Sequence, residues 1–225
     1  MCGRYVSPDR AAIERSFNLS AKVERNPFAG DFNAVPTRSL PVLRENPESH
    51  ELELDLLRWG LVPHWAKDLK FGSHTTNARA ETVATKPSFR AAYKARRCLV
   101  PALGYYEWQA VPSGKQPYYF SAADGSMLSF AGLWESWRPP EGGDPVLTFT
   151  IIVGEANPFT RDVHDRMPII VEPADRKRWL EDRDVDDLIL PGRPNPLKRY
   201  PVSKAVNSSR SKGPALIEPT ELASP

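Results

Sequence analysis

Short apolar runs, separated by prolines, glycines and polar residues, make up most of this chain. In residues 51–61, "ELELDLLRWGL", leucines alternate with acidic residues, and this period of two predicts a half-buried strand. The apolar runs at residues 147–154 and 167–172 predict buried strands. Two further aromatic and apolar runs flank Asp124-Gly125, which predicts a β-hairpin at that turn.

Helices are expected at about residues 8–18, 88–96 and 173–181. The first opens with Ser7-Pro8-Asp9, which supplies an N-cap, a first-turn proline and an acidic residue. Ile13 and Phe17 follow one helical turn apart, so they can share a buried face.

The mixed order of strands and helices decides the fold class, together with 23 prolines and 13 glycines that divide the chain into short pieces. We expect an α+β fold, with a curled, barrel-like, mostly antiparallel β-sheet flanked by a few short helices. The length of 225 residues fits a single domain, residues 1–225. The basic, proline-punctuated segment 198–219 is expected to wrap the surface, and about residues 216–225 are expected to form a disordered tail.

Composition excludes several classes of protein. A hydrophobic content of 40% and a charged content of 26% are typical of soluble globular proteins. The chain has no apolar run long enough to span a membrane, and its first twenty residues lack the pattern of a signal peptide, so we expect a cytoplasmic protein. Two cysteines are too few for a disulfide framework or a cysteine metal site. With a net charge of +2, any binding to DNA must depend on local clusters of charge.

Four clusters collect residue types that can do chemistry: "MCGR" at the start, "TTNARAET" around Asn77, "GYYEW" around Glu107 and "HDRMP" around His164. Buried packing is the ordinary role of a residue such as Cys2. However, a small second residue normally allows Met1 to be removed, which would leave Cys2 with a free α-amine beside its thiol. An α-amine has a pKa of about 7.7 to 8.0, so a useful fraction is neutral at physiological pH. Such an aminothiol can form a Schiff base with an aldehyde and close to a thiazolidine.

The acid/base candidates each allow a structural alternative. Strand alternation places Glu107 on the same face as Tyr105, either as an exposed edge-strand side chain or as a carboxylate whose pKa is raised by its neighbours. His164 lies in a loop between two predicted strands, where it can titrate near neutral pH or be a structural histidine oriented by Asp165.

The cluster around Asn77 has two interpretations as well. Asn77 either caps the following helix or positions a nucleophile with its amide. Arg79 either pairs with Glu81 on the surface or binds a phosphate. None of the four clusters is a phosphate loop, a zinc pattern or a serine elbow.

Taken together, the clusters resemble the SRAP family, the abasic-site processing proteins that cross-link themselves to damaged single-stranded DNA. The resemblance runs nearly end to end through nine segments: "MCGRY", "FNAVPT", "LRWGLVPHWA", "NARAET", "PSFRAAYKARRCLVPALGYYEW", "FAGLWESW", "FTIIVGEAN", "HDRMPIIVE" and "YPVSKAV". No single segment is specific, but nine in the same order are.

The resemblance implies a role for each matching residue. Cys2 would attack the ring-opened aldehyde of an abasic deoxyribose, and Asn77 would position its α-amine. Glu107 would help to open the cyclic hemiacetal, and His164 would assist Schiff-base chemistry and reversal of the cross-link. The residues implied to bind DNA are Arg4, Asn33, Pro36, Trp65, Arg79 and Arg166. No cofactor and no metal are implied, and the expected partner of a monomeric protein is single-stranded DNA with abasic sites, including junctions with duplex DNA.

Two positions depart from the family pattern. Leu103 stands where many relatives carry an acidic or small residue, and Gly154 stands where a threonine is common, which puts one hydroxyl contact to DNA in doubt. Two other functions stay open. The same residues could serve an N-terminal-nucleophile thiol peptidase or amidohydrolase, or the chain could be a non-catalytic single-strand binder in which Cys2 is packing.

Overall fold

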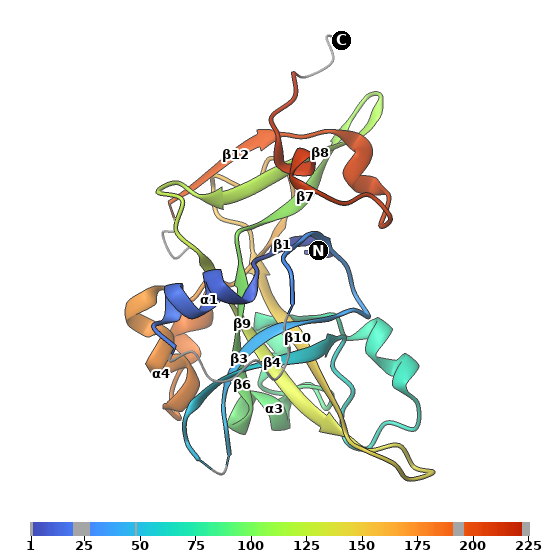
Figure 1. The fold of residues 1–225 in the computed structure, drawn as a ribbon, viewed down its shortest axis with the longest axis vertical. Helices are drawn as coiled ribbons and strands as arrows, with labels where there is room; N and C mark the ends of the chain where they lie inside the picture. The colour runs from blue at the N-terminus through green and yellow to red at the C-terminus, as the bar shows by residue number, and fades with distance from the viewer. Residues whose placement is uncertain (1, 20–27, 48, 191–195, 222–225) are drawn as a thin grey trace.

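The computed structural model describes residues 2–19, 28–47, 49–190 and 196–221. Its strands form two sheets, which occupy the upper and lower parts of Figure 1. The upper sheet has the strand order β12-β8-β7-β1-β2, and every neighbouring pair is antiparallel. Its strands are β1 (Tyr5–Ser7), β2 (Asp31–Ala34), β7 (Gly104–Val111), β8 (Gly114–Ala122) and β12 (Leu197–Pro201).

The lower sheet closes on itself and is called the barrel sheet below. Its order is β11-β10-β4-β3-β6-β9, and β9 pairs again with β10, so five strands form a closed ring. Among the strands that the structure describes, only the pairings of β10 with β4 and β5 are parallel. Its strands are β3 (Ser39–Glu45), β4 (Leu52–Trp59), β5 (Asn77–Arg79), β6 (Arg97–Ala102), β9 (Leu128–Trp137), β10 (Val146–Glu155) and β11 (Arg166–Pro168). The prediction of an α+β fold with a barrel-like, mostly antiparallel sheet is therefore confirmed.

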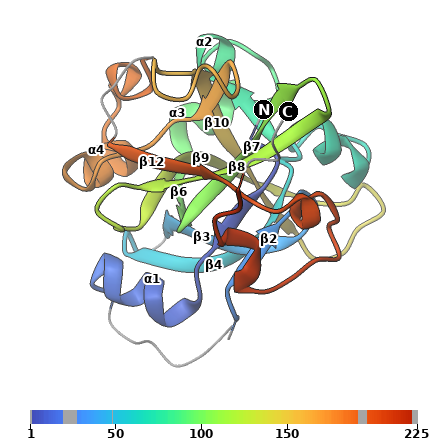
Figure 2. The ribbon, with the colours of Figure 1, turned by 90° about the horizontal axis from the view of Figure 1, so that it is seen from above.

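The helices are short. The α-helices are α1 (Arg10–Phe17), α2 (Ala80–Val83), α3 (Arg90–Ala95) and α4 (Arg176–Glu181). The 3₁₀-helices are η1 (Leu69–His74), η2 (Pro173–Asp175), η3 (Asp186–Ile189), η4 (Lys204–Asn207) and η5 (Pro214–Ile217). Figures 1 and 2 show α1 and α4 on the same side of the molecule. Ile13 of α1, Tyr93 of α3 and Trp179 of α4 belong to one apolar cluster against the barrel sheet.

The first helix exists where it is predicted, but its start is different. Ser7 is the last residue of β1 and pairs with Asp31 of β2, so it cannot serve as the N-cap. Asp9 takes that role, since its side chain accepts a hydrogen bond of 2.7 Å from the N–H of Ala12.

The predicted hairpin at Asp124-Gly125 is wrong. β8 pairs with β7 and β12 in the upper sheet, whereas β9 pairs with β6 and β10 in the barrel sheet. The turn therefore carries the chain from one sheet to the other. This crossing lets Phe120 of β8 and Phe130 of β9 both contact the ring of Tyr105 in the core between the sheets.

The N-terminal strand lies at the centre of that core. Tyr5 makes edge-to-face contacts with Trp59 and Phe130, at ring distances of 5.3 and 6.0 Å. Cys2 belongs to the same apolar cluster and has no exposed surface. The start of the chain is therefore packed into the core between the two sheets.

The C-terminal segment covers the outer face of the upper sheet. After β12, Val206 and Leu216 are buried against Tyr106 and Tyr119. Residues 222–225 of the expected tail lie outside the described residues. Within the described part of the chain, no helix is long and apolar enough to cross a membrane.

Candidate active site

The four catalytic candidates come from both sheets. Cys2 lies three residues before the first residue of β1, and Glu107 lies on β7, which pairs with β1. His164 lies in the turn between β10 and β11, and Asn77 is the first residue of β5, which pairs with β10. The structure brings Glu107 and His164 together where the upper sheet meets the turn that follows β10.

Glu107 is buried on an interior strand. β7 lies between β8 and β1, and only 3% of Glu107 is exposed, so the interpretation as an exposed edge-strand glutamate is wrong. Because burial disfavours the charged form, it raises the pKa of Glu107 to about 7. A carboxyl group with this pKa can both give and take a proton near neutral pH.

His164 lies next to this carboxyl group. Its Nε2 is 3.9 Å from Oε2 of Glu107. Its Nδ1 accepts a hydrogen bond of 3.0 Å from the backbone N–H of Arg166, and the Asp165 carboxylate lies 3.0 Å from the same nitrogen. Burial lowers the pKa of His164, which favours the neutral ring. The Arg166 N–H favours a neutral ring with its proton on Nε2, whereas the Asp165 carboxylate favours a proton on Nδ1.

The turn that carries His164 is held from three directions. The Asn157 side chain accepts hydrogen bonds of 3.0 Å from two backbone N–H groups that follow it. Arg199 donates to the carboxylate of Asp162, with 2.6 Å between Nη2 and Oδ2. Gln109 on β7 donates to the carbonyl of Asp162 at 3.1 Å. Sequence reasoning missed these partners, although the Asn-Pro-Phe-Thr start of the turn was a visible signal.

The environment of the Cys2 thiol disfavours its thiolate form. Its Sγ faces the carbonyl oxygen of Arg4 at 4.0 Å. Burial raises the pKa of the thiol, and the negative charge of Glu107 raises it further. The thiol is therefore protonated at neutral pH.

Asn77 does not cap a helix. It pairs with Ile151 of β10, and the N-cap position of α2 is occupied by Arg79. Nδ2 of Asn77 is buried without a hydrogen-bond partner in the described residues. An unsatisfied buried donor costs about 1 to 3 kcal/mol, so an additional acceptor placed there would be stabilised.

Two arginines flank the end of β10, one on each edge. Arg79 pairs with Val153 in the β5–β10 register and is exposed. Arg166 pairs with Glu155 in the β10–β11 register. Glu81 binds Arg166, so the alternative in which Glu81 pairs with Arg79 is wrong.

Arg4 and Asn33 bind the C-terminal segment. Arg4 donates to Oδ1 of Asn33 at 2.9 Å, to the carbonyl of Asn207 at 3.0 Å and to the carbonyl of Val206. Asn33 is fully buried, and its Nδ2 donates to the carbonyls of Ser208 and Ser211, at 2.9 and 3.1 Å. A direct contact of the Asn33 side chain with DNA would require these bonds to break.

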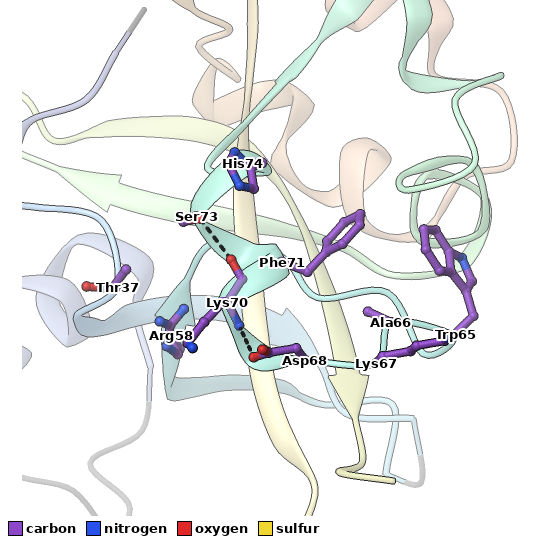
Figure 3. A pocket seen from close by; sticks show the side chains of 10 residues that line it. All are labelled: Thr37, Arg58, Trp65, Ala66, Lys67, Asp68, Lys70, Phe71, Ser73 and His74. Carbon is purple, nitrogen blue, oxygen red and sulfur yellow. Dashed lines mark hydrogen bonds between the residues drawn. The ribbon is translucent and has the colours of Figure 1, made fainter.

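Pro36 and Trp65 lie in two partly exposed loops. Pro36 follows β2, and the adjoining Thr37 lines a hollow of about 790 Å³. Trp65 lines the same hollow, is 49% exposed and contacts Phe71 edge to face at 5.3 Å. Figure 3 shows Trp65 and Phe71 toward one end of the hollow and Thr37 toward the other.

The two residues that depart from the family pattern, Leu103 and Gly154, both lie in packed surroundings. Leu103 packs against the apolar cluster on the outer face of the upper sheet. A Cβ atom added at Gly154 would lie 2.8 Å from Cδ1 of Ile169, which is closer than side-chain contacts normally come. Because Gly154 has no Cβ atom, the Ile169 side chain has room to pack beside β10.

A comparison with known families decides the classification. The family model described as SOS response associated peptidase (SRAP) matches residues 1–209. The chain belongs to the SRAP family. It is 36% identical to the abasic site processing protein YoqW of Bacillus subtilis, over 97% of this chain and 99% of that protein. It is 33% identical to the abasic site processing protein HMCES of Gallus gallus, over 88% of this chain and 68% of that protein.

Solved structures of similar proteins share the SRAP fold described here. A crystal structure from Bacteroides thetaiotaomicron superimposes with a TM-score of 0.83 at 24% identity and covers 98% of this chain and 100% of that one. A crystal structure from Bordetella bronchiseptica gives a TM-score of 0.74 at 27% identity, over 90% and 100%. The resemblance drawn from the nine sequence segments is thus confirmed.

Proposed function

We propose that this protein processes abasic sites in single-stranded DNA by forming a covalent cross-link through Cys2 after removal of Met1. One observation carries the proposal. The buried Glu107, whose pKa is about 7, lies 3.9 Å from His164, and its negative charge raises the pKa of the Cys2 thiol. The names of the relatives, abasic site processing proteins, support the same substrate.

The proposed reaction begins with the masked sugar. Glu107 transfers a proton to open the cyclic hemiacetal, a step suited to a group populated in both protonation states near pH 7. The α-amine of Cys2 then adds to the aldehyde carbon, and loss of one water leaves a C=N bond. His164, whose Nε2 faces Glu107, assists that loss of water.

The thiol completes the cross-link. Sγ of Cys2 adds to the imine carbon while its proton goes to the nitrogen, which closes a five-membered thiazolidine. A protonated thiol suits this step, because the addition consumes the proton. Asn77 would hold the α-amine through its amide. Since a Schiff base acidifies the neighbouring C–H of the sugar, a weaker β-elimination lyase activity and reversal assisted by His164 belong to the proposal.

The proposed DNA path follows the exposed residues around this centre. Arg79 and Arg166 would bind phosphates on either side of β10. Trp65 and Pro36 would contact bases, with stacking worth about 1 to 3 kcal/mol per base. Arg4 and Asn33 would act through the C-terminal segment that they hold. A monomer supplies all of these groups, and strands with a duplex junction fit the proposal as well as simple single strands.

Intact mass spectrometry tests the proposal. The chain is mixed with a single strand that carries an abasic site and with the matched intact strand. Loss of Met1 and an adduct with the abasic strand alone are expected. The adduct should be absent after Cys2→Ala and present after Cys98→Ala, which removes the other buried free cysteine. An adduct that survives Cys2→Ala without a reducing agent contradicts the thiazolidine mechanism.

The two alternatives predict different results. A thiol peptidase should hydrolyse peptides without DNA, but the raised pKa of the Cys2 thiol disfavours this chemistry. A non-catalytic binder should hold abasic and intact strands equally well and give no covalent product.

A further inference from the structure

The turn between β10 and β11 holds His164 at a distance from Glu107 that is sensitive to small movements. Nε2 of His164 lies 3.9 Å from Oε2 of Glu107, whereas a hydrogen bond between such atoms spans about 2.7 to 3.2 Å. A movement of the turn by about 1 Å therefore decides whether the two groups can share a proton. The contacts that fix the turn thus matter for acid/base chemistry at this pair.

Arg199 holds the turn from outside. It lies on β12, an edge strand of the upper sheet, where it pairs with Phe120 of β8. Its guanidinium binds both carboxylate oxygens of Asp162, with 2.6 Å between Nη2 and Oδ2, and donates a further hydrogen bond to the carbonyl of Phe159. A two-pronged contact of this kind fixes direction as well as distance. Arg199 therefore binds the turn at two positions.

The same guanidinium also packs against the strand pair that carries Glu107. Its Cζ lies 4.9 Å from the centre of the Phe159 ring and 5.9 Å from the centre of the Tyr118 ring. Tyr118 of β8 is directly opposite Glu107 of β7, so the two side chains are on one face of the upper sheet. Arg199 thus contacts both the turn and the sheet face that carries Glu107.

Asp162 is bound through its backbone as well as through its side chain. Gln109, two positions after Glu107 on β7, donates a hydrogen bond of 3.1 Å to the Asp162 carbonyl. The Asp162 carboxylate is bound by Arg199, and His164 follows only two residues later. A shift of Asp162 relative to the upper sheet would therefore carry the imidazole with it.

The ion pair between Arg199 and Asp162 is charged throughout the pH range in which the acid/base pair titrates. The hydrogen bonds between them lower the pKa of Asp162 and raise the pKa of Arg199. The Asp162 side chain is 54% exposed, and exposed ion pairs contribute little to the stability of a fold. The effect of this pair therefore falls on the local geometry of the turn and not on global stability.

We propose that Arg199 is a positioning residue, which holds His164 beside Glu107 through its ion pair with Asp162. The hydrogen bonds that Asn157 accepts shape the turn internally, and Arg199 places the turn against the upper sheet. This inference rests on the proposed function, because His164 has its acid/base role in that reaction.

Variants that keep the net charge test this positioning. Arg199→Lys, and the double variant of Asp162→Asn with Arg199→Gln, both remove the two-pronged contact. The matched control is Lys198→Gln, which removes an exposed cation from the neighbouring position of β12. Each protein is mixed with a saturating amount of a single strand that carries an abasic site, and the rate of adduct formation is measured on a denaturing gel. Every rate is measured again in chains that also carry His164→Gln.

We expect both variants to form the adduct more slowly than the unmodified chain. A misplacement of about 1 Å can lower a rate by up to about 100-fold. Lys198→Gln should leave the rate unchanged. In chains with His164→Gln, Arg199→Lys should cause no further decrease, because the group that Arg199 positions is already absent.

An NMR titration of the DNA-free protein gives a second readout. Burial lowers the pKa of His164, so a less firmly held turn should let the pKa of the ring rise toward its ordinary value. The charged groups around the ring, Glu107, Asp165 and Lys115, are retained in Arg199→Lys, so a rise reports a change of position and not of charge. The spectrum of His164→Gln assigns the signal among the four histidines of the chain.

Two results in the adduct assay would overturn the inference: a rate of Arg199→Lys equal to that of the unmodified chain, or an equal fold decrease with and without His164. Failure of the proposed function has a different signature, because the unmodified chain would then form no adduct at all. The NMR titration decides in that case, since an unchanged pKa of His164 in Arg199→Lys would show that Arg199 does not position the ring.

Discussion

At the scale of single residues, Glu107 departs furthest from its ordinary behaviour. Its pKa is raised from 4.5 to about 7 because the fold leaves only 4% of the side chain exposed. Between these two pH values the folded state holds a proton that the unfolded state has released. Stability therefore falls as the pH rises through this window, since the unfolded state binds fewer protons there.

We predict that Glu107→Gln removes this pH dependence. Relative to the variant, the unmodified chain should lose about 3 kcal/mol of unfolding free energy between pH 4.5 and pH 7.5. Urea unfolding of both proteins at pH 4.5 and pH 7.5 measures the difference. Glu155→Gln, at an exposed position of β10, is the control and should behave like the unmodified chain. A parallel pH dependence in Glu107→Gln would contradict the burial argument.

Residue types were easier to predict than their environments. The sequence placed Glu107 and Tyr105 on one strand face, yet left open whether that face is exposed, because burial depends on the neighbouring strands. Arg4 was expected at a phosphate, but in the structure it donates to the carbonyl of Asn207. No local sequence pattern predicts a hydrogen bond from Arg4 to a carbonyl so far away in sequence.

At the scale of elements, the C-terminal segment depends on a side chain from β2. Asn33→Ala would remove the hydrogen bonds from Nδ2 to the carbonyls of Ser208 and Ser211, and such a bond contributes about 0.5 to 1.5 kcal/mol to stability. Urea unfolding should show a loss of this size. Arg210→Gln, at an exposed position of the same segment, should leave the stability unchanged. Equal stability of both variants would mean that the segment is held by its apolar contacts alone.

Elements were predicted better than their pairing. The alternation in residues 51–61 located β4, and the apolar run at 147–154 located β10. The Asp124-Gly125 pair indicated a turn correctly, but a turn specifies a change of direction and not a neighbouring strand. Packing of their apolar faces places β8 and β9 in different sheets.

At the scale of the whole molecule, the proposed site draws its residues from both sheets. Cys2 and Glu107 come with the upper sheet, and His164 and Asn77 come with the barrel sheet. The fold class could be predicted from composition and element order. Closure of the ring could not, because the parallel pairing of β10 with β4 joins strands that are distant in sequence.

This arrangement predicts a large effect of folding on the reaction. A peptide of residues 2–19 carries the same aminothiol without Glu107 and His164. General acid–base groups contribute about 10²- to 10⁴-fold, so the folded chain should react with an abasic strand faster than the peptide by that factor. Time courses at pH 7 on a denaturing gel measure both rates. Equal rates would show that the aminothiol needs no help from the fold.

The central claim is that both the amine and the thiol of Cys2 bond to one sugar carbon. Tandem mass spectrometry of the DNA-linked N-terminal peptide tests it most directly, after digestion and treatment with a thiol-alkylating reagent. The account predicts a peptide that begins at Cys2, carries the sugar with loss of one water, and is not alkylated at its thiol, whereas Cys98 is alkylated once the chain is unfolded. An adduct on a lysine such as Lys115, or a cross-linked Cys2 with an alkylated thiol, would contradict it.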